Sequence, residues 1–161
     1  MARPIAFRLC YPRQRSWRTA KRGHSATKRP QGKTVLIADD EDGVLTTWRL
    51  ILERAGYQVI AVSNCAEGLK ALANNAPIDA LISDLHMERQ NIGLELARAA
   101  MQQHPKPVVM LCTGYADVHN SRAALDLRVD YMATKPVELE ELLAALASLL
   151  ARRAAASSGA D

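Results

Sequence analysis

The feature of this sequence that most constrains its fold is a repeated alternation of short apolar runs with longer amphipathic segments. Five runs of five residues are mostly apolar and bounded by polar or turn residues, which is typical of buried strands. The runs are 34–38, 58–62, 79–83, 107–111 and 129–133. Helical periodicity marks the segments 43–55, 65–74, 92–103, 117–127 and 137–152. Strands that are apolar on both faces and separated by helices predict an α/β fold, a doubly wound three-layer sandwich around a five-stranded parallel sheet.

The charge of the chain is divided unevenly along its length. Residues 1–32 hold nine Lys or Arg, three prolines and no acid, whereas the remainder holds 12 basic and 17 acidic residues, a net charge of −5. Because the first segment has no apolar periodicity, it cannot bury enough surface to offset the entropy of ordering. We therefore predict a disordered basic leader over 1–32, one domain over 33–152 and a short disordered tail over 153–161.

Composition also excludes several classes of protein. No apolar run approaches the roughly 20 residues that cross a bilayer, and the opening segment does not resemble a secretory signal, so we expect a cytoplasmic protein without membrane contact. The cysteines Cys10, Cys65 and Cys112 are odd in number and widely separated, which favours reduced thiols over a metal or redox pair. Gly32-Lys33-Thr34 resembles the end of a phosphate-binding loop, but it precedes a strand instead of following one.

Polar residues gather where the predicted strands end. Asp39 and Asp40 follow the first strand, Asp84 follows the third, Thr113 lies at the end of the fourth and Lys135 follows the fifth. In a parallel sheet these positions converge at one edge. Taken singly, each is explained by a solvated loop or a helix cap. Together, the carboxylates repel one another unless a hard cation such as Mg²⁺ binds between them. The Lys135 ammonium could neutralise the oxygens of a phosphoryl group, and the Thr113 hydroxyl could donate a hydrogen bond to one of them.

Four motifs at these strand ends carry a resemblance to a known family. The motifs are V-L-I-A-D-D-E-D, A-L-I-S-D-L-H-M, V-M-L-C-T-G-Y-A-D and Y-M-A-T-K-P-V, in this order along residues 33–152. They resemble the successive signatures of response-regulator receiver domains of two-component systems, in particular a stand-alone receiver similar to the chemotaxis regulator. The resemblance implies a flavodoxin-like fold.

The resemblance also implies roles for particular residues. It makes Asp84 the phosphoacceptor, contacted by Thr113 and Lys135, with the Lys135-Pro136 peptide bond cis. The implied cofactor is Mg²⁺, bound by four oxygen donors. These donors are the carboxylates of Asp39, Asp40 and Asp84 and the backbone carbonyl of His86.

Three positions depart from the family pattern. Glu88 stands where a proline is usual, and the loop glycine, matched to Gly93, comes one residue late. Met132 stands where an aromatic switch residue is usual, while Tyr131 is one position earlier. Because successive strand residues face opposite sides, Tyr131 can serve as the switch only through a bulge or a shift of register. The side chains of His86 and Tyr115 are expected to tune the loss of the phosphoryl group.

The predicted function is signalling rather than enzymatic catalysis. Asp84 would accept a phosphoryl group from a sensor histidine kinase or a histidine phosphotransfer protein, and a separate protein would read the change, with homodimerisation as one route. One alternative is a receiver-like binding module whose basic leader contacts nucleic acid, since Tyr11 and Trp17 lie among its arginines. A solvated leader without a function is the simpler explanation of this segment. Another is an aspartyl-nucleophile phosphatase using Asp40 and Asp42, which the short chain disfavours.

Overall fold

The described part of the chain folds around a five-stranded sheet. The computed structural model describes residues 32–74, 77–87, 91–114 and 126–158. All neighbouring strands pair in parallel, in the order β2-β1-β3-β4-β5, which confirms the predicted doubly wound α/β fold. The strands are β1 (Thr34–Ala38), β2 (Gln58–Val62), β3 (Ala80–Asp84), β4 (Val108–Thr113) and β5 (Tyr131–Thr134).

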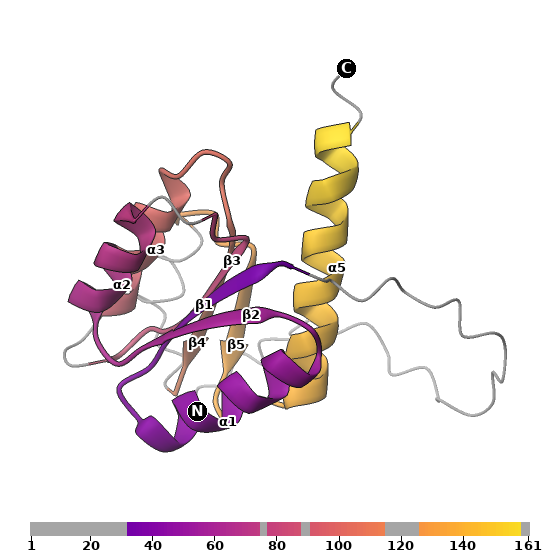
Figure 1. Cartoon of the computed structure of the whole chain (residues 1–161). Helices are drawn as coiled ribbons and strands as arrows, with labels where there is room; N and C mark the ends of the chain where they lie inside the picture. The colour runs from indigo at the N-terminus through magenta and orange to yellow at the C-terminus, as the bar shows by residue number, and fades with distance from the viewer. Residues whose placement is uncertain (1–31, 75–76, 88–90, 115–125, 159–161) are drawn as a thin grey trace, which may run out of the picture.

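Helices cover both faces of this sheet (Figure 1). The described helices are α1 (Asp42–Arg54), α2 (Cys65–Ala73), α3 (Ile92–Met101) and α5 (Leu139–Ser158). α2 and α3 pack on one face, whereas α1 and α5 pack on the other. The helix predicted over 117–127 falls largely on residues 115–125, outside the described ranges. No helix within those ranges has the length and apolar character that a bilayer crossing requires.

Alternation along the central strands divides the core into two layers. On β1, Leu36 and Ala38 face α2 and α3, while Val35 and Ile37 face α1 and α5. Each of these four side chains is at most 2% exposed. Burying an aliphatic side chain of this size contributes about 1.5–3 kcal/mol, so both apolar faces of the strand stabilise the sandwich and fix its strand register.

Two strands extend further toward their carboxyl ends than the sequence indicates. β3 ends on Asp84, which was expected just past the strand, and β4 ends on Thr113. The pairing continues because Asp84 lies opposite Cys112 and the amide of Leu85 donates to the Cys112 carbonyl at 2.8 Å. Backbone hydrogen bonding therefore anchors both polar residues to the rigid sheet.

The C-terminal boundary predicted at residue 152 is wrong for the helix. α5 continues to Ser158, so residues 153–158 are helical where a disordered tail was expected. Alanine and arginine are strong helix formers. In addition, the Arg153 guanidinium donates to both carboxylate oxygens of Asp130, at 3.0 and 2.8 Å, and to the backbone carbonyl of Lys106. These contacts hold the extended helix against the sheet.

Asp130 also explains why β5 begins later than expected. Its carboxylate accepts a hydrogen bond from the Val109 amide at 2.8 Å, occupying the donor that a longer β5 would otherwise pair with. Two residues earlier, Arg128 has a left-handed backbone (φ 54°), which turns the chain before the strand. Ladder pairing therefore starts at Tyr131.

We predict that Arg153→Gln lowers the free energy of unfolding by about 1–2 kcal/mol, because it removes a charged donor from Asp130 and from Lys106. The neighbouring Arg152→Gln is the matched control, since Arg152 is exposed and an exposed substitution usually changes stability by less than about 0.5 kcal/mol. Urea denaturation followed by circular dichroism measures both. Equal midpoints for the two variants would refute the stabilising role of these contacts.

Candidate functional site at the carboxyl edge of the sheet

Two buried aspartates meet at the carboxyl edge of the sheet. Asp39 directly follows β1 and Asp84 ends β3, and these strands are neighbours in which Ala38 lies opposite Ser83. Asp39 is 5% exposed and Asp84 is 7% exposed. Burying two carboxylates so close together requires positive charge or hydrogen-bond donors directed at them.

Lys135 supplies that positive charge. Its ammonium lies 2.9 Å from an oxygen of Asp39 and 2.9 Å from an oxygen of Asp84. Burial lowers the pKa of Lys135, but its hydrogen bonds to Asp84 and Asp39 and the charges of both carboxylates outweigh burial, so the pKa is raised above the usual lysine value. The ammonium therefore stays protonated throughout the neutral range.

The backbone around Lys135 places its side chain at the site. The Lys135 amide donates to the carbonyl of Thr113 at 2.7 Å, which continues the pairing of β4 with β5 beyond the last strand residue. The Lys135-Pro136 peptide bond is cis, as the family resemblance implies.

Each carboxylate is held through both of its oxygens. One oxygen of Asp39 accepts from the Glu41 amide at 2.9 Å, and one oxygen of Asp84 accepts from the His86 amide at 3.1 Å. The remaining oxygen of each carboxylate accepts from Lys135. Amide donors and one shared ammonium thus fix the orientation of both groups.

A third carboxylate completes an acidic cluster. Oxygens of Asp39, Asp40 and Asp84 all lie within 4.8 Å of one another, and Asp40 is exposed. Hard oxygen donors at this spacing fit a small divalent cation such as Mg²⁺. The structure thus brings together all three carboxylates that the sequence assigned to a metal, and the donor set is chemically suitable for that ion.

The segment after Asp84 is organised by His86. Its ring Nδ1 accepts a hydrogen bond from the Asn91 amide at 3.4 Å, just before α3 begins. Asn91 has a left-handed backbone (φ 62°), which asparagine tolerates better than most residues. The predicted irregularity at Glu88 falls on residues 88–90, outside the described ranges, so it stays a prediction.

Gly93 touches the backbone of the acceptor candidate. A Cβ atom built at this glycine would lie 2.2 Å from the Asp84 carbonyl oxygen and 2.9 Å from the Leu85 Cα. The Gly93 amide also donates to the Leu85 carbonyl at 3.2 Å. The sequence marked Gly93 only as a displaced loop glycine, whereas the structure shows that a side chain here would push against the strand end that carries Asp84.

β4 contributes a buried hydroxyl and a buried thiol beside the acidic cluster. Thr113 is 1% exposed at the strand end. Burial raises the pKa of the Cys112 thiol to about 12, with Lys135 lowering it and Asp84 and Asp39 raising it. Because the thiol is neutral and enclosed, Cys112 acts here as a small apolar residue, in agreement with the reduced thiol predicted from the sequence.

The structure separates Tyr131 from Met132. Tyr131 packs on the face covered by α1 and α5, whereas Met132 packs on the opposite face with the α2 and α3 cluster. Their strand pairs regularly with β4 through Met110 and Leu111, without a bulge. Tyr115, the other position expected to tune the site, lies outside the described residues.

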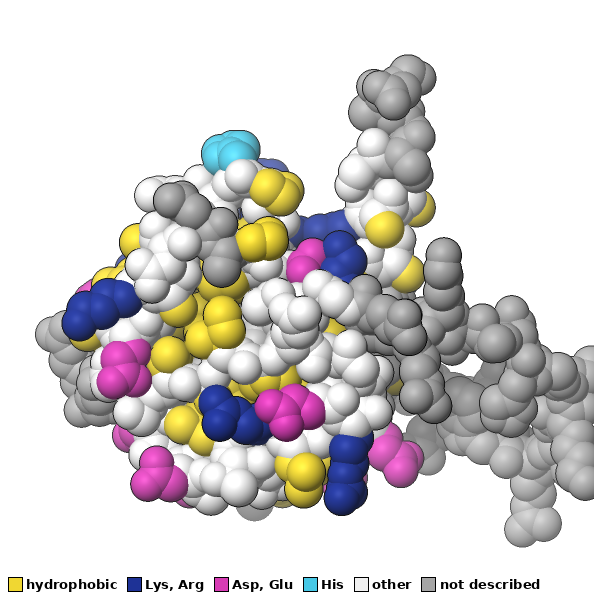
Figure 2. All heavy atoms as spheres, in the orientation of Figure 1, with side chains coloured by type: hydrophobic (Ala, Val, Ile, Leu, Met, Phe, Trp, Pro, Cys, Tyr) yellow, Lys and Arg dark blue, Asp and Glu magenta, His cyan; other side chains and the backbone are white. Residues whose placement is uncertain are grey.

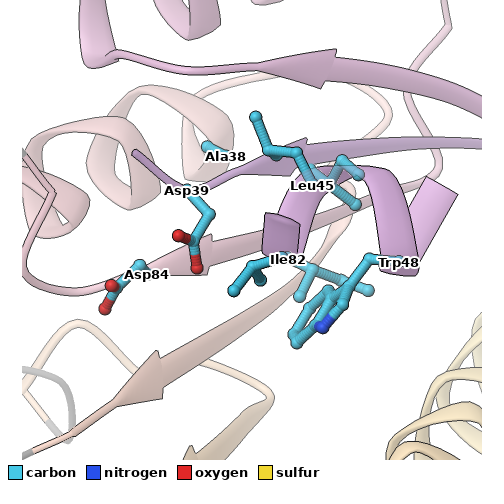
Figure 3. Close-up of a pocket in the computed structure, with 8 residues that line it drawn as sticks. Ala38, Asp39, Leu45, Trp48, Ile82 and Asp84 are labelled. Atoms are coloured by element: carbon cyan, nitrogen blue, oxygen red, sulfur yellow. The ribbon is translucent and has the colours of Figure 1, made fainter. Parts of the chain in front are cut away.

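A small crevice adjoins the acidic cluster (Figure 3). It lies between α1 and the ends of β1 and β3. Asp39 and Asp84 lie at its polar end, and Leu45, Trp48 and Ile82 form an apolar wall. Sequence reasoning missed Leu45 and Trp48, because on an amphipathic helix a residue near a site looks the same as any core-facing residue.

Together, the fold and the site define a class of protein: a doubly wound α/β domain whose carboxyl edge holds buried carboxylates bridged by a lysine, as in a receiver domain. Residues 35–147 match the family described as response regulator receiver domain. The chain belongs to this family, which confirms the predicted class of two-component signalling protein.

Similar proteins agree with this assignment. The chain is 35% identical over 127 residues to the response regulator MprA of Mycobacterium sp. (strain KMS), covering 79% of this chain and 54% of that protein. The chain thus spans only about half the length of this curated relative. A solved CheY-like receiver domain from Methanospirillum hungatei JF-1 has a TM-score of 0.69 and 29% identity, covering 74% of this chain and 94% of that one.

One solved relative was crystallised in a modified state. It is a response regulator from Burkholderia pseudomallei with a phosphorylated aspartic acid, a calcium ion and citrate. Its TM-score is 0.64 at 29% identity, and the similarity covers 78% of this chain and 74% of that chain.

We predict that Gly93→Ala lowers the free energy of unfolding by about 1–3 kcal/mol, because the added methyl group must displace backbone at Asp84 and Leu85. Gly43→Ala is the matched control: Gly43 is exposed in α1, and apart from its chain neighbours and the backbone of its own helix no atom lies within 4 Å of the position that the added methyl group would take. Alanine there leaves stability unchanged or raises it by up to about 1 kcal/mol. Urea denaturation measures the free energy of unfolding of both variants. A Gly93 variant as stable as the Gly43 variant would refute the close approach.

Proposed function

We propose that Asp84 is the phosphoryl acceptor of this receiver and that it takes the group from a phosphohistidine on a partner protein. The observation that carries the proposal is the set of contacts at its carboxylate, which is buried at a strand end, oriented by the His86 amide and paired with Lys135. A fixed carboxylate beside a permanent cation is a suitable nucleophile for phosphoryl transfer.

The proposed transfer is a displacement at phosphorus. An Asp84 carboxylate oxygen forms a bond to phosphorus while the phosphorus–nitrogen bond to the histidine ring breaks. The bonding electron pair stays on that ring nitrogen, and the product on this chain is an aspartyl phosphate. Lys135 already donates to Asp84, so its ammonium can follow the added negative charge and stabilise the phosphoryl oxygens.

The acidic cluster supports Mg²⁺ as the cofactor of this reaction. Asp39, Asp40 and Asp84 are proposed to hold the ion with their carboxylates, and His86 with its backbone carbonyl. When bound, the ion supplies positive charge that offsets the repulsion between carboxylates and phosphoryl oxygens. The Thr113 hydroxyl at the end of β4 is proposed to donate to one of those oxygens.

The partners and boundaries of the chain belong to the same proposal. A sensor histidine kinase or a phosphotransfer protein supplies the group, and a separate protein reads the modified surface, in the cytoplasm and without enzymatic turnover of a small substrate. The receiver unit spans 33–152, preceded by the basic leader 1–32, and the Arg153 contacts add the last turns of α5 to it. The phosphorylated aspartate of the Burkholderia relative supports the chemistry.

We predict that incubation with acetyl phosphate and Mg²⁺ produces a hydroxylamine-sensitive phosphoryl adduct in the wild type and none in Asp84→Asn. Asp42→Asn is the control, because Asp42 is an exposed acid in the first turn of α1 outside the cluster. Lys135→Met should slow adduct formation by roughly 10²–10³, the usual cost of losing one donor to developing charge. Intact-protein mass spectrometry measures the phosphorylated fraction of the wild type and of the three variants. Equal labelling of Asp84→Asn and the wild type would exclude Asp84 as the acceptor.

We also propose that Met132, not Tyr131, couples phosphorylation to the surface that the partner protein reads, since Met132 faces the α2 and α3 side of the sheet. Met132→Ala is expected to leave adduct formation at Asp84 intact while reducing the change in hydrogen exchange that phosphorylation causes in residues 126–134. Tyr131→Phe, on the opposite face, should preserve that change. The reverse pattern, with only the Tyr131 variant losing the response, would assign the coupling to Tyr131.

A further inference from the structure

The chain just after Asp84 is anchored on both sides of His86. Leu85 is fully buried and Met87 is 1% exposed, and both pack in the core layer of α2 and α3. The Leu85 carbonyl also accepts a hydrogen bond from the Gly93 amide at 3.2 Å. His86 itself is half-buried and lies between these two anchored neighbours, next to the acidic cluster.

His86 contacts both the acceptor candidate and the start of α3. Its backbone amide donates to an Asp84 carboxylate oxygen at 3.1 Å, and its ring Nδ1 accepts from the Asn91 amide at 3.4 Å. Asn91 is the last residue before α3, and its carbonyl accepts from the Leu94 amide at 3.0 Å, in the first turn of that helix. The ring therefore joins the backbone beside the acidic cluster to a helix packed in the core.

The direction of the ring contact fixes the position of the imidazole proton. A backbone amide can only donate, so Nδ1 of His86 must accept and carries no hydrogen. In a neutral ring the single proton is then on Nε2. With the proton on Nδ1, the ring and the amide would direct two N–H groups at each other. The contact with Asn91 thus selects one tautomer of His86.

The backbone of Asn91 is suited to this contact. Its φ of 62° lies in the left-handed region, which asparagine adopts more readily than most residues. The side-chain oxygen of Asn91 is enclosed and has no hydrogen-bond partner among the described residues, and the bond to His86 runs through the Asn91 amide. The backbone conformation at this residue is therefore what presents the amide to the ring.

We propose that His86 is a positioning residue for the divalent cation: its ring, as the Nε2–H tautomer, binds the Asn91 amide and thereby holds the His86 backbone in the conformation that serves the acidic cluster. This role rests on the proposed Mg²⁺ site and deepens it, because the ring is not itself a ligand. Burial of Leu85 and Met87 still allows the peptide plane that carries the His86 carbonyl to rotate, since two soft dihedrals flank it. The bond to Asn91 restrains that rotation.

The direction of this carbonyl matters because of the ion that the site suits. Mg²⁺ requires nearly ideal octahedral geometry, so a small rotation of one oxygen donor weakens its binding. Carboxylates adjust through their side-chain torsions, whereas a backbone carbonyl is aimed only by the chain on either side of it. Groups that orient a ligand from outside the coordination sphere typically change metal affinity by roughly 10- to 100-fold. The His86 ring is placed to act in this way.

The tautomer is tested by ¹⁵N–¹H correlation spectra of the full chain labelled with ¹⁵N-histidine. The spectra are recorded at about pH 8, where an ordinary imidazole is neutral. The His86 signals are those that disappear in His86→Asn, and their pattern should show Nε2 protonated and Nδ1 without a proton.

His104 provides an internal comparison for these spectra. It is exposed, and Figure 2 shows a histidine side chain projecting from the surface. Its Nδ1 lies 3.0 Å from the Gln102 carbonyl oxygen, which can only accept, so in this contact the proton is on Nδ1. The two described histidines should therefore give opposite patterns.

The positioning role is tested by the Mg²⁺ affinity of the wild type, His86→Ala and His86→Asn, measured by isothermal titration calorimetry. All three proteins keep the backbone carbonyl at this position. An asparagine side-chain oxygen is bonded to Cγ, as Nδ1 is, so it can accept from the Asn91 amide, whereas alanine cannot. We expect His86→Ala to weaken Mg²⁺ binding roughly tenfold and His86→Asn to restore most of the loss.

Hydrogen exchange of the Asn91 amide reports on the contact without any metal. This amide should exchange slowly in the wild type and in His86→Asn, and faster in His86→Ala. Circular dichroism verifies that the variants fold.

A second pair of variants tests the other end of the bond. Asn91→Gly keeps the amide and the left-handed conformation, so it should bind Mg²⁺ nearly as the wild type does. Asn91→Val keeps the amide but disfavours positive φ, so it should weaken binding as His86→Ala does. The double variant His86→Ala/Asn91→Val should be no weaker than either single variant, because both remove the same contact.

Three results would contradict the proposed role of His86. The first is a proton on Nδ1. The second is equal Mg²⁺ affinity of His86→Ala and the wild type. The third is a loss in His86→Asn as large as in His86→Ala, because the effect would then not run through the Asn91 contact. A wild type that binds no Mg²⁺ would refute the proposed cofactor as well, whereas a binding wild type with unaffected variants would refute the role of His86 alone.

Discussion

The structure of the site depends on one ammonium shared by two buried carboxylates. Lys135 lies 2.9 Å from both Asp39 and Asp84, and without it two negative charges would stand together in a nearly solvent-free position. The same contact joins the ends of β1, β3 and β5, which are far apart in the sequence. The stability of the sheet edge and the phosphoryl transfer proposed for Asp84 therefore depend on the same interaction, because a group that adds negative charge at Asp84 changes the balance of charge around Lys135.

Close packing around the aspartate complements this electrostatic constraint. Gly93 lies against the Asp84 carbonyl, and the amides of Glu41 and His86 hold one oxygen of each carboxylate. The acceptor candidate is thus fixed through its backbone, through its side chain and through its charge. At the far end of the strands, Asp130 and Arg153 fix the start of β5 and the end of α5. Hydrogen bonds and ion pairs thus fix the chain at both ends of the strands.

Much of this organisation was predictable from residues alone. The bounds of β1 and β2 agree with the apolar runs, and the acidic residues, Thr113 and Lys135 were assigned to one edge because parallel strands must end together. The last turns of α5 were wrongly predicted as a disordered tail, since the partner of Arg153 is distant in sequence at Asp130. Trp48 and Leu45 were missed beside the site, because helical periodicity shows that a side chain is buried but not what it is buried against.

The sequence by itself determined the order of strands and helices, the residue types available at each strand end and the division of charge between leader and domain, because periodicity and composition are local properties. Only the tertiary structure decided that Lys135 bridges both aspartates, that Gly93 must lack a side chain, and that Met132 and Tyr131 face opposite layers. These features depend on distances of a few ångströms between segments far apart in the chain, and such distances exist only after the sheet has been assembled and packed.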